Sequence, residues 1–315
     1  MRKAPDFASI FAPELKNYVG FMKDSGRVFK VETTILKAFD RYAQNVGASI
    51  ITEELVNHYV YSVSFLSVEQ YAKRYRIVRG FNQYLCLKST GELIRPMEKV
   101  RNRKRHISYI YTPEDICLML RAATTLLPQA SLRPQTYFSL FGLLYTTGLR
   151  ISEAIHLDNR DVDLEQGILS IRETKFRKSR IVPIHETTKS ILQSYAAQRD
   201  TLIPITDCDA FFLNNRKKRL SYGTVNNTFL TLSRQCGLRN AEDESPRIHD
   251  LRHTFAVRRV AAWYDEGADI QEKLPLLSTY MGHAHFEDTT YYLNAGAELL
   301  ARGAKRFQME VSDDA

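Results

Sequence analysis

The spacing of hydrophobic positions predicts a helical first third of the chain. Over the first hundred residues, apolar side chains recur every three or four positions, which is typical of helices that bury one face. A capping Thr52 precedes one of these stripes. The three stripes are Ile35, Phe39, Tyr42 and Val46; Leu55, Tyr59 and Val63; and Tyr71, Tyr75, Val78, Phe81 and Leu85. We predict about four short helices whose aromatic stripes form a core rather than a binding surface.

A basic, polar segment interrupts this pattern near residue 100. It has no apolar periodicity and contains Lys99, Arg101, Arg103, Lys104 and Arg105. We place the domain boundary here, which gives a helical domain over residues 1–98, a basic linker over 99–106 and a second domain over 107–315. A basic connection between domains suits contact with a phosphate backbone, and a solvated linker is the alternative.

The second domain is predicted to be helical with a small sheet. Thr112, Pro113, Glu114 and Asp115 form a helix start, with a capping hydroxyl, a proline at the first position and two acids in the first turn. Residues 168–171 and 180–184 are short and β-branched, and the polar residues 172–179 separate them, which indicates a hairpin. The predicted fold class is therefore mainly α with a small β-sheet, a helical N-terminal domain being followed by an α+β domain.

Composition limits the class of partner. The chain has 315 residues, and 44 Lys and Arg against 36 Asp and Glu give a net charge of +8, so it should attract polyanions. The widely spaced Cys86, Cys117, Cys208 and Cys236 fit neither a disulfide framework nor a compact zinc site, which favours a reducing cytosol. No secretory segment and no apolar run of membrane-spanning length is present in the sequence, so we expect no membrane partner.

Candidate chemistry is concentrated in the second domain. Six residues that can handle a phosphate follow one another there: Arg150, Lys175, His249, Arg252, His283 and Tyr292. They lie in the segments TTGLRISEAIHL, RETKFRKSRIVPI, RIHDLRHTFA and YMGHAHFEDTTYYL. Together, in this order, these segments closely resemble the tyrosine recombinase (phage integrase) family. The resemblance covers roughly the last two thirds of the chain and is specific because it needs four separated motifs.

Arginines suit the phosphodiester that such a site would hold. The phosphate gains negative charge as a nucleophile approaches, and a guanidinium stabilises its non-bridging oxygens. Arg150 lies at a predicted helix start, and Arg252 follows His249 by three positions on one helical face. The resemblance implies that both arginines bind the phosphate. Glu153 either orients the Arg150 guanidinium or forms a plain surface ion pair.

Strand cleavage also needs proton carriers, because the attacking tyrosine loses a proton and the departing 5′ oxygen gains one. His249 is the candidate to accept the first proton, since imidazole titrates near neutrality. By resemblance, Lys175 protonates the leaving group, with Lys178 as the runner-up, and His283 hydrogen-bonds the scissile phosphate. The stretch between Arg252 and His283 is several residues longer than is usual in the family, which bears on the packing that delivers His283.

The nucleophile has three candidates. Tyr291 and Tyr292 are adjacent, so on a helix only one of them can face the site. The family spacing from His283 selects Tyr292, Tyr291 would then pack, and Tyr280 is a remote third option.

A metal site is the competing interpretation of the histidines. His249 and His253 are four apart, and His283 and His285 follow, but the glutamate of a His-Glu-x-x-His motif and paired cysteines are missing. We therefore expect no metal and no cofactor.

The resemblance implies an architecture and a reaction. The first domain would be a core-binding domain that closes with the catalytic domain around double-stranded DNA as a C-shaped clamp. The reaction would be site-specific recombination for integration, excision or transposition of a mobile element, through a 3′-phosphotyrosine and a Holliday junction. The partners would be DNA with an inverted-repeat recombination site and further copies of the chain, in a tetrameric synapse. The C-terminal tail would dock on a neighbouring copy, and a frayed terminus is the alternative. A type IB topoisomerase and a non-catalytic DNA-binding accessory protein are the alternatives.

Overall fold

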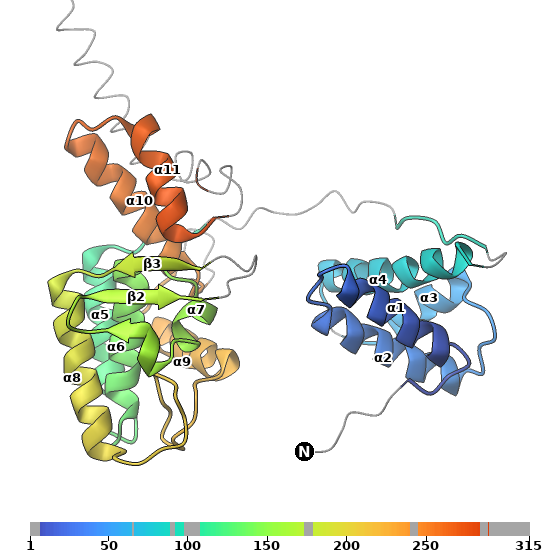
Figure 1. The fold of residues 1–315 in the computed structure, drawn as a ribbon, viewed down its shortest axis with the longest axis horizontal. Helices are drawn as coiled ribbons and strands as arrows, with labels where there is room; N and C mark the ends of the chain where they lie inside the picture. The colour runs from blue at the N-terminus through green and yellow to red at the C-terminus, as the bar shows by residue number, and fades with distance from the viewer. Residues whose placement is uncertain are drawn as a thin grey trace, which may run out of the picture. The chain divides into compact units, whose positions relative to one another are not determined.

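The computed structural model describes residues 7–64, 66–88, 92–97, 108–172, 179–239, 245–283 and 289. The chain forms two compact units, residues 1–105 and residues 106–315 (Figure 1). The predicted linker over residues 99–106, with its five basic side chains, lies outside the described residues.

The described part of the first unit contains four helices. They are α1 (Ala12–Asp24), α2 (Lys30–Asn45), α3 (Glu53–Tyr61) and α4 (Val68–Cys86). The hydroxyl of Thr52 accepts a hydrogen bond from the backbone N–H of Leu55 at 3.1 Å, which confirms the predicted cap of α3. Ser67 caps α4 in the same way and forms a reciprocal capping box with Gln70.

The predicted stripes form the core of the first unit, where α4 packs against the other three helices. Phe39, Tyr59 and Phe81 are fully enclosed, and the rings of Phe39 and Tyr59 meet edge to face with centroids 5.3 Å apart. The prediction that the aromatic stripes are core is confirmed. It is wrong for Val46, which is 52% exposed, because α2 ends at Asn45 and Val46 only caps the helix.

The second unit is mainly helical. Its helices are α5 (Pro113–Thr124), α6 (Arg133–Thr147), α7 (Ile151–Ile155), a 3₁₀ turn η1 (Asn159–Asp161), α8 (Glu186–Leu202), α9 (Tyr222–Gln235), α10 (Asp250–Asp265) and α11 (Ile270–Met281). The predicted start of α5 is confirmed: the Thr112 hydroxyl accepts from Asp115 N at 3.1 Å, and the Asp115 carboxylate accepts from Thr112 N at 3.0 Å.

Helix α6 lies at the centre of the second unit, with α5, α8 and α10 packed around it (Figure 1). Consecutive residues of α6, such as Leu140, Phe141 and Leu143, are buried, so the helix is enclosed on most sides, as expected of a central helix. It ends at Gly148, and the chain then turns into α7. The core of the unit therefore fixes the position of the residues that follow α6.

A three-stranded antiparallel sheet covers one side of the unit, in the order β1 (Val162–Asp163), β2 (Ile168–Ile171), β3 (Arg180–Pro183). Ile168 pairs with Pro183 and Ile171 with Arg180, which confirms the two predicted strands. Strand β1 was not predicted, because two residues are too few to show an alternating pattern.

Helices α10 and α11 pack on each other through Val257, Val260, Leu274 and Leu277, and α11 also contacts β3. The two helices are drawn in orange-red in Figure 1. The observed architecture confirms the fold class, mainly α with a small β-sheet. None of the helices in the described part of the chain is both long and apolar enough to cross a membrane.

Candidate active site

The turn between α6 and α7 depends on a glycine. Gly148 has a left-handed backbone with φ of 61°, and a Cβ at this position would lie 2.5 Å from Cδ1 of Phe255. Only glycine tolerates both conditions without strain. Arg150 follows two residues later as the N-cap of α7, which confirms the predicted position at a helix start.

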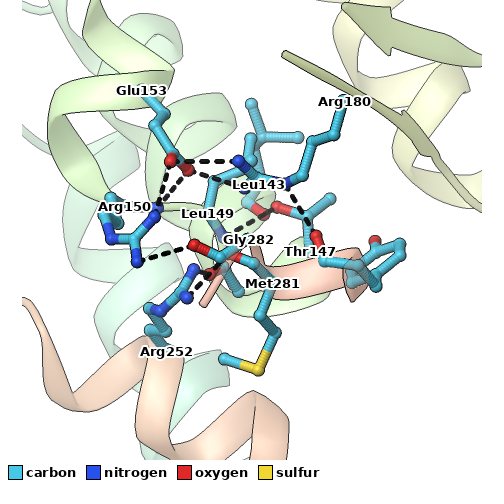
Figure 2. Close-up of polar contacts among 11 residues, drawn as sticks. Leu143, Thr147, Leu149, Arg150, Glu153, Arg180, Arg252, Met281 and Gly282 are labelled. Atoms are coloured by element: carbon cyan, nitrogen blue, oxygen red, sulfur yellow. Dashed lines mark hydrogen bonds and ion pairs between the residues drawn. The ribbon is translucent and has the colours of Figure 1, made fainter. Parts of the chain in front are cut away.

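The end of α11 gathers three arginines from three different elements (Figure 2). Three successive carbonyls accept one hydrogen bond each: Tyr280 O from Arg180 Nε at 2.7 Å, Met281 O from Arg252 Nη2 at 2.8 Å, and Gly282 O from Arg150 Nη2 at 3.0 Å. The last carbonyls of a helix lack intrahelical partners and carry negative partial charge, so cations are favourable there. The C-terminal turn of α11 therefore sets the spacing of the three guanidiniums.

Arg252 joins the ends of two helices. Its side chain comes from the first turn of α10 and the residue is 2% exposed. Besides the bond to Met281 O (Figure 2), it donates from Nη1 to Gly148 O at 2.6 Å, at the end of α6. Main-chain acceptors on both sides leave this guanidinium little freedom to reorient.

Glu153 holds two of the arginines. Its carboxylate accepts from Arg150 Nη1 at 2.9 Å, and from Arg180 Nη1 and Nη2 at 3.1 and 2.8 Å (Figure 2). Its side chain is 6% exposed. Burial opposes its charge, but the hydrogen bonds and the charge of Arg180, together with the hydrogen bonds from Arg150, outweigh burial and lower the pKa of Glu153. The structure agrees with the expectation that Glu153 orients Arg150, and the alternative of a plain surface ion pair is wrong because the carboxylate is buried and also binds Arg180.

Arg180 was missed at the level of sequence. It opens β3 and reaches both Glu153 and α11. The signal available was a charged residue within a short β-branched strand, but nothing in the sequence indicated its partners.

The two histidines of the predicted set lie beside the arginines. His249 immediately precedes α10 and is partly exposed to solvent. Its pKa is lowered to about 4, mainly because the protein shields part of the ring from water and next because of the charges of Arg252 and Arg150. Burial, with Arg252 and Arg150 next, lowers the pKa of His283 to about 3, and His283 Nδ1 lies 2.7 Å from Thr289 Oγ1. Both imidazoles are therefore neutral at pH 7 and can accept a proton or a hydrogen bond.

The structure thus brings together Arg150, His249, Arg252 and His283. The remaining predicted residues lie outside the described part of the chain: Lys175, Lys178, His285, Tyr291 and Tyr292, and the linker residues Lys99, Arg101, Arg103, Lys104 and Arg105. No group of three or more His, Cys, Asp or Glu side chains with the spacing of a metal site occurs among the residues described.

Tyr280 is poorly placed to be a nucleophile. Its ring stacks on Phe255 with centroids 5.6 Å apart, and its hydroxyl donates to Pro183 O at 3.4 Å. Burial is the main influence on this phenol and raises its pKa to about 12. A raised pKa disfavours the phenolate that would have to attack.

Known proteins are similar to this chain over most of its length. The model of the phage integrase family matches residues 112–298. The integrase/recombinase y4rE of Sinorhizobium fredii (strain NBRC 101917 / NGR234) is 34% identical over 302 residues, covering 95% of this chain and 96% of its own. The tyrosine recombinase XerC of Chlamydia caviae (strain ATCC VR-813 / DSM 19441 / 03DC25 / GPIC) is 27% identical, covering 91% and 87%.

Among solved structures, the XerH site-specific recombinase bound to palindromic difH substrate, in a post-cleavage complex, superimposes with a TM-score of 0.59. It is 20% identical and covers 88% of this chain and 79% of its own, so it supports the fold. The chain belongs to the phage integrase family of tyrosine site-specific recombinases, which confirms the resemblance seen in its motifs.

Proposed function

We propose that this recombinase cuts and rejoins double-stranded DNA with Tyr292 as its nucleophile. The Tyr292 oxygen attacks the scissile phosphorus, forms a 3′-phosphotyrosine bond and displaces the 5′ oxygen of the next nucleotide. The 5′-hydroxyl of a partner strand then attacks that bond and restores Tyr292. The bond energy is conserved in the exchange, which passes through a Holliday junction.

The observation that carries this proposal is the anchoring of Arg150 and Arg252 on one helix end, 2.8 to 3.0 Å from successive carbonyls. Within the described residues, the side chain of Arg150 bonds only Glu153 and Gly282, so other donors of its fork-shaped guanidinium remain for a ligand. A phosphodiester matches such paired, preorganised donors, which stabilise the charge that builds up as phosphorus becomes five-coordinate.

The histidines supply the proton chemistry. His249 is neutral at pH 7 and takes the proton that Tyr292 loses on attack. His283 donates a hydrogen bond to a non-bridging oxygen of the phosphate. Lys175 gives a proton to the departing 5′ oxygen, and Lys178 is the alternative donor. These cations and donors provide the charge stabilisation, so the cycle needs no metal and no cofactor.

The DNA partner is proposed to be a duplex with an inverted-repeat site, bound by a homo-oligomer that assembles as a tetrameric synapse. The support is the palindromic substrate of the XerH complex and the net charge of +8. In this proposal the domains over residues 1–98 and 107–315 clamp the duplex, and the five basic residues of the linker contact its backbone. All four cysteines are free, consistent with work in a reducing cytosol.

A covalent trapping experiment tests the function. Target duplex is first recovered from random-sequence DNA by selection for binding, and is then nicked close to the cleavage position so that the released 5′ fragment diffuses away. Wild-type protein should form an SDS-resistant adduct, also in excess EDTA. Tyr292→Phe should abolish it and leave binding intact, because only the nucleophilic oxygen is lost.

Tyr291→Phe is the matched control and should label normally. Labelling by Tyr292→Phe would overturn the assignment of the nucleophile. Plasmid relaxation without any paired site would favour a topoisomerase, and binding without an adduct would favour an accessory protein.

A further inference from the structure

Arg180 is the one arginine at the end of α11 that the proposed chemistry leaves unused. Its side chain is 10% exposed and makes three hydrogen bonds, two to Glu153 and one to Tyr280 O. Burial of a paired charge is weak evidence for stability, because desolvation offsets most of the attraction. The position of these bonds, rather than their number, indicates what the residue does.

The bonds of Arg180 connect three elements that each carry part of the site. Arg180 begins β3, Glu153 lies in α7 directly after Arg150, and Tyr280 lies in the last turn of α11, which leads to His283. Glu153 accepts from Arg150 and Arg180 together, so moving one guanidinium displaces the carboxylate that the other one uses. The arrangement couples the orientation of Arg150 to that of Arg180.

The chain leaves space for this connection at Gly282. A Cβ at that position would lie 2.7 Å from Arg180 Nη1, and the residue adopts a left-handed φ of 67°. Gly282 in turn presents the carbonyl that Arg150 uses. The missing side chain of Gly282 therefore leaves room for Arg180, its carbonyl accepts the hydrogen bond from Arg150, and the next residue is His283.

We propose that Arg180 is a positioning residue for strand cleavage. Through Glu153 it orients the Arg150 guanidinium, and through Tyr280 O it holds the turn of α11 that carries the anchor carbonyls and His283. It thereby helps Arg150 to stabilise the negative charge of the scissile phosphate, and it takes no part in protonation of the leaving group. The inference rests on the proposed function, since it presupposes that Arg150 binds the phosphate.

Modified substrates distinguish these two effects. A methylphosphonate at the scissile position removes one negative charge, so correct placement of Arg150 matters less. A 5′ bridging sulfur leaves as a thiolate without protonation, so a general acid matters less. A residue that acts on the phosphate through Arg150 should respond to the first change and not to the second.

The experiment measures adduct formation by the full chain on three nicked duplexes, namely phosphate, methylphosphonate and 5′-thio. Arg180→Gln should slow adduct formation by about 10- to 100-fold on the phosphate. It should show the same loss on the 5′-thio duplex and a several-fold smaller loss on the methylphosphonate, with DNA affinity nearly unchanged. An equal loss on all three, or recovery on the 5′-thio duplex, would overturn the proposal.

Arg199→Gln is the matched control for loss of a buried, anchored arginine. The side chain of Arg199 is also 10% exposed and bonds a carboxylate, Asp200, and a carbonyl, Phe211 O, away from the site. It should lower Tm without changing the ratio of rates among the three duplexes. If Arg180→Gln does not fold, Arg180→Lys keeps the charge and should shift the ratios in the same direction by a smaller amount. Ratios equal to the wild type would contradict the inference.

A second measurement tests the connection through Glu153. Because Arg180 and Glu153 act on Arg150 as one unit, the double variant Arg180→Gln, Glu153→Gln should be little slower than the worse single variant. Losses that multiply would refute the coupling. Wild-type adduct formation is read in the same assay, so its absence would refute the proposed function, whereas wild-type activity with the wrong ratios would refute only the role of Arg180.

Discussion

Gly148 lies against the ring of Phe255 so closely that a Cβ at position 148 would stand 2.5 Å from Phe255 Cδ1. The same glycine ends α6 with a φ of 61° and offers its carbonyl to Arg252 at 2.6 Å. The turn before Arg150 is thus fixed by packing, by backbone conformation and by one arginine at once.

Gly148→Ala should therefore destabilise the protein. The left-handed backbone and the contact with Phe255 both penalise a side chain, and together they predict a loss of about 2 to 4 kcal/mol in the free energy of unfolding. Urea denaturation would measure it. Gly142→Ala, in the middle of α6, is the control, because a Cβ there meets nothing within 4 Å and alanine should gain up to about 1 kcal/mol of helix propensity. Equal stability of the two variants would contradict this account of the turn.

The pH dependence of cleavage should report the lowered pKa of His249. A base works when neutral, so activity is present above its pKa and is lost as the pH falls through it. That pKa is about 4 in the free protein, and a bound phosphate, being an anion, raises it. For adduct formation, kcat/KM reports the free protein and should thus stay level from about pH 7 to about pH 5. The value of kcat reports the DNA-bound protein and should begin to decline at a higher pH than kcat/KM does. A decline of kcat/KM centred on 6.5, the ordinary value, would show that His249 is unperturbed or is not the base.

Lys175→Ala should be rescued by a sulfur at the 5′ leaving position. A thiolate departs without protonation, whereas an alkoxide needs an acid, so only loss of the general acid is repaired in this way. The measurement is the adduct rate on 5′-oxygen and 5′-sulfur duplexes, with Lys178→Ala in parallel. Rescue of the Lys178 variant instead would identify Lys178 as the general acid.

Changing Arg101, Arg103, Lys104 and Arg105 together to Ser should weaken binding to target and random duplex alike. Each lost phosphate contact removes a released counterion and lowers the slope of log affinity against log salt by about 0.9. Titrations at several salt concentrations would show a flatter slope with little loss of discrimination. An unchanged slope would show that the segment only connects the two domains, and a selective loss of target binding would mean that it contacts bases.

Features that depend on neighbours in sequence could be predicted. The capping box of Thr112 and Asp115 needs only a few consecutive residues, and the stripe through Tyr75, Val78 and Phe81 needs only the helical period. Arg150 and Arg252 could be selected because their motifs occur in a defined order, although they are far apart in the chain.

The contacts that hold the site could not be predicted in the same way. Arg252 bonds Gly148 across 104 positions and Arg150 bonds Gly282 across 132, and both acceptors are main-chain oxygens. A carbonyl has no signature in the sequence, since every residue has one. Arg180 was missed for the same reason, because its partners depend on where α7 and α11 end in space.

Anchoring by main-chain carbonyls determines which evolutionary changes the site tolerates. Replacing the buried Met281 by another apolar residue that fits the core between α10 and α11 leaves its oxygen in place, whereas inserting or deleting one residue in the last turn of α11 would rotate every acceptor away from its arginine. Positions 280 and 281 therefore need a main-chain oxygen at the right place more than a particular side chain, whereas position 282 must also remain glycine, because a Cβ there would lie 2.7 Å from Arg180 Nη1. We expect relatives to differ in the side chains at positions 280 and 281 and to keep both the glycine and the spacing from Arg252 to the end of α11.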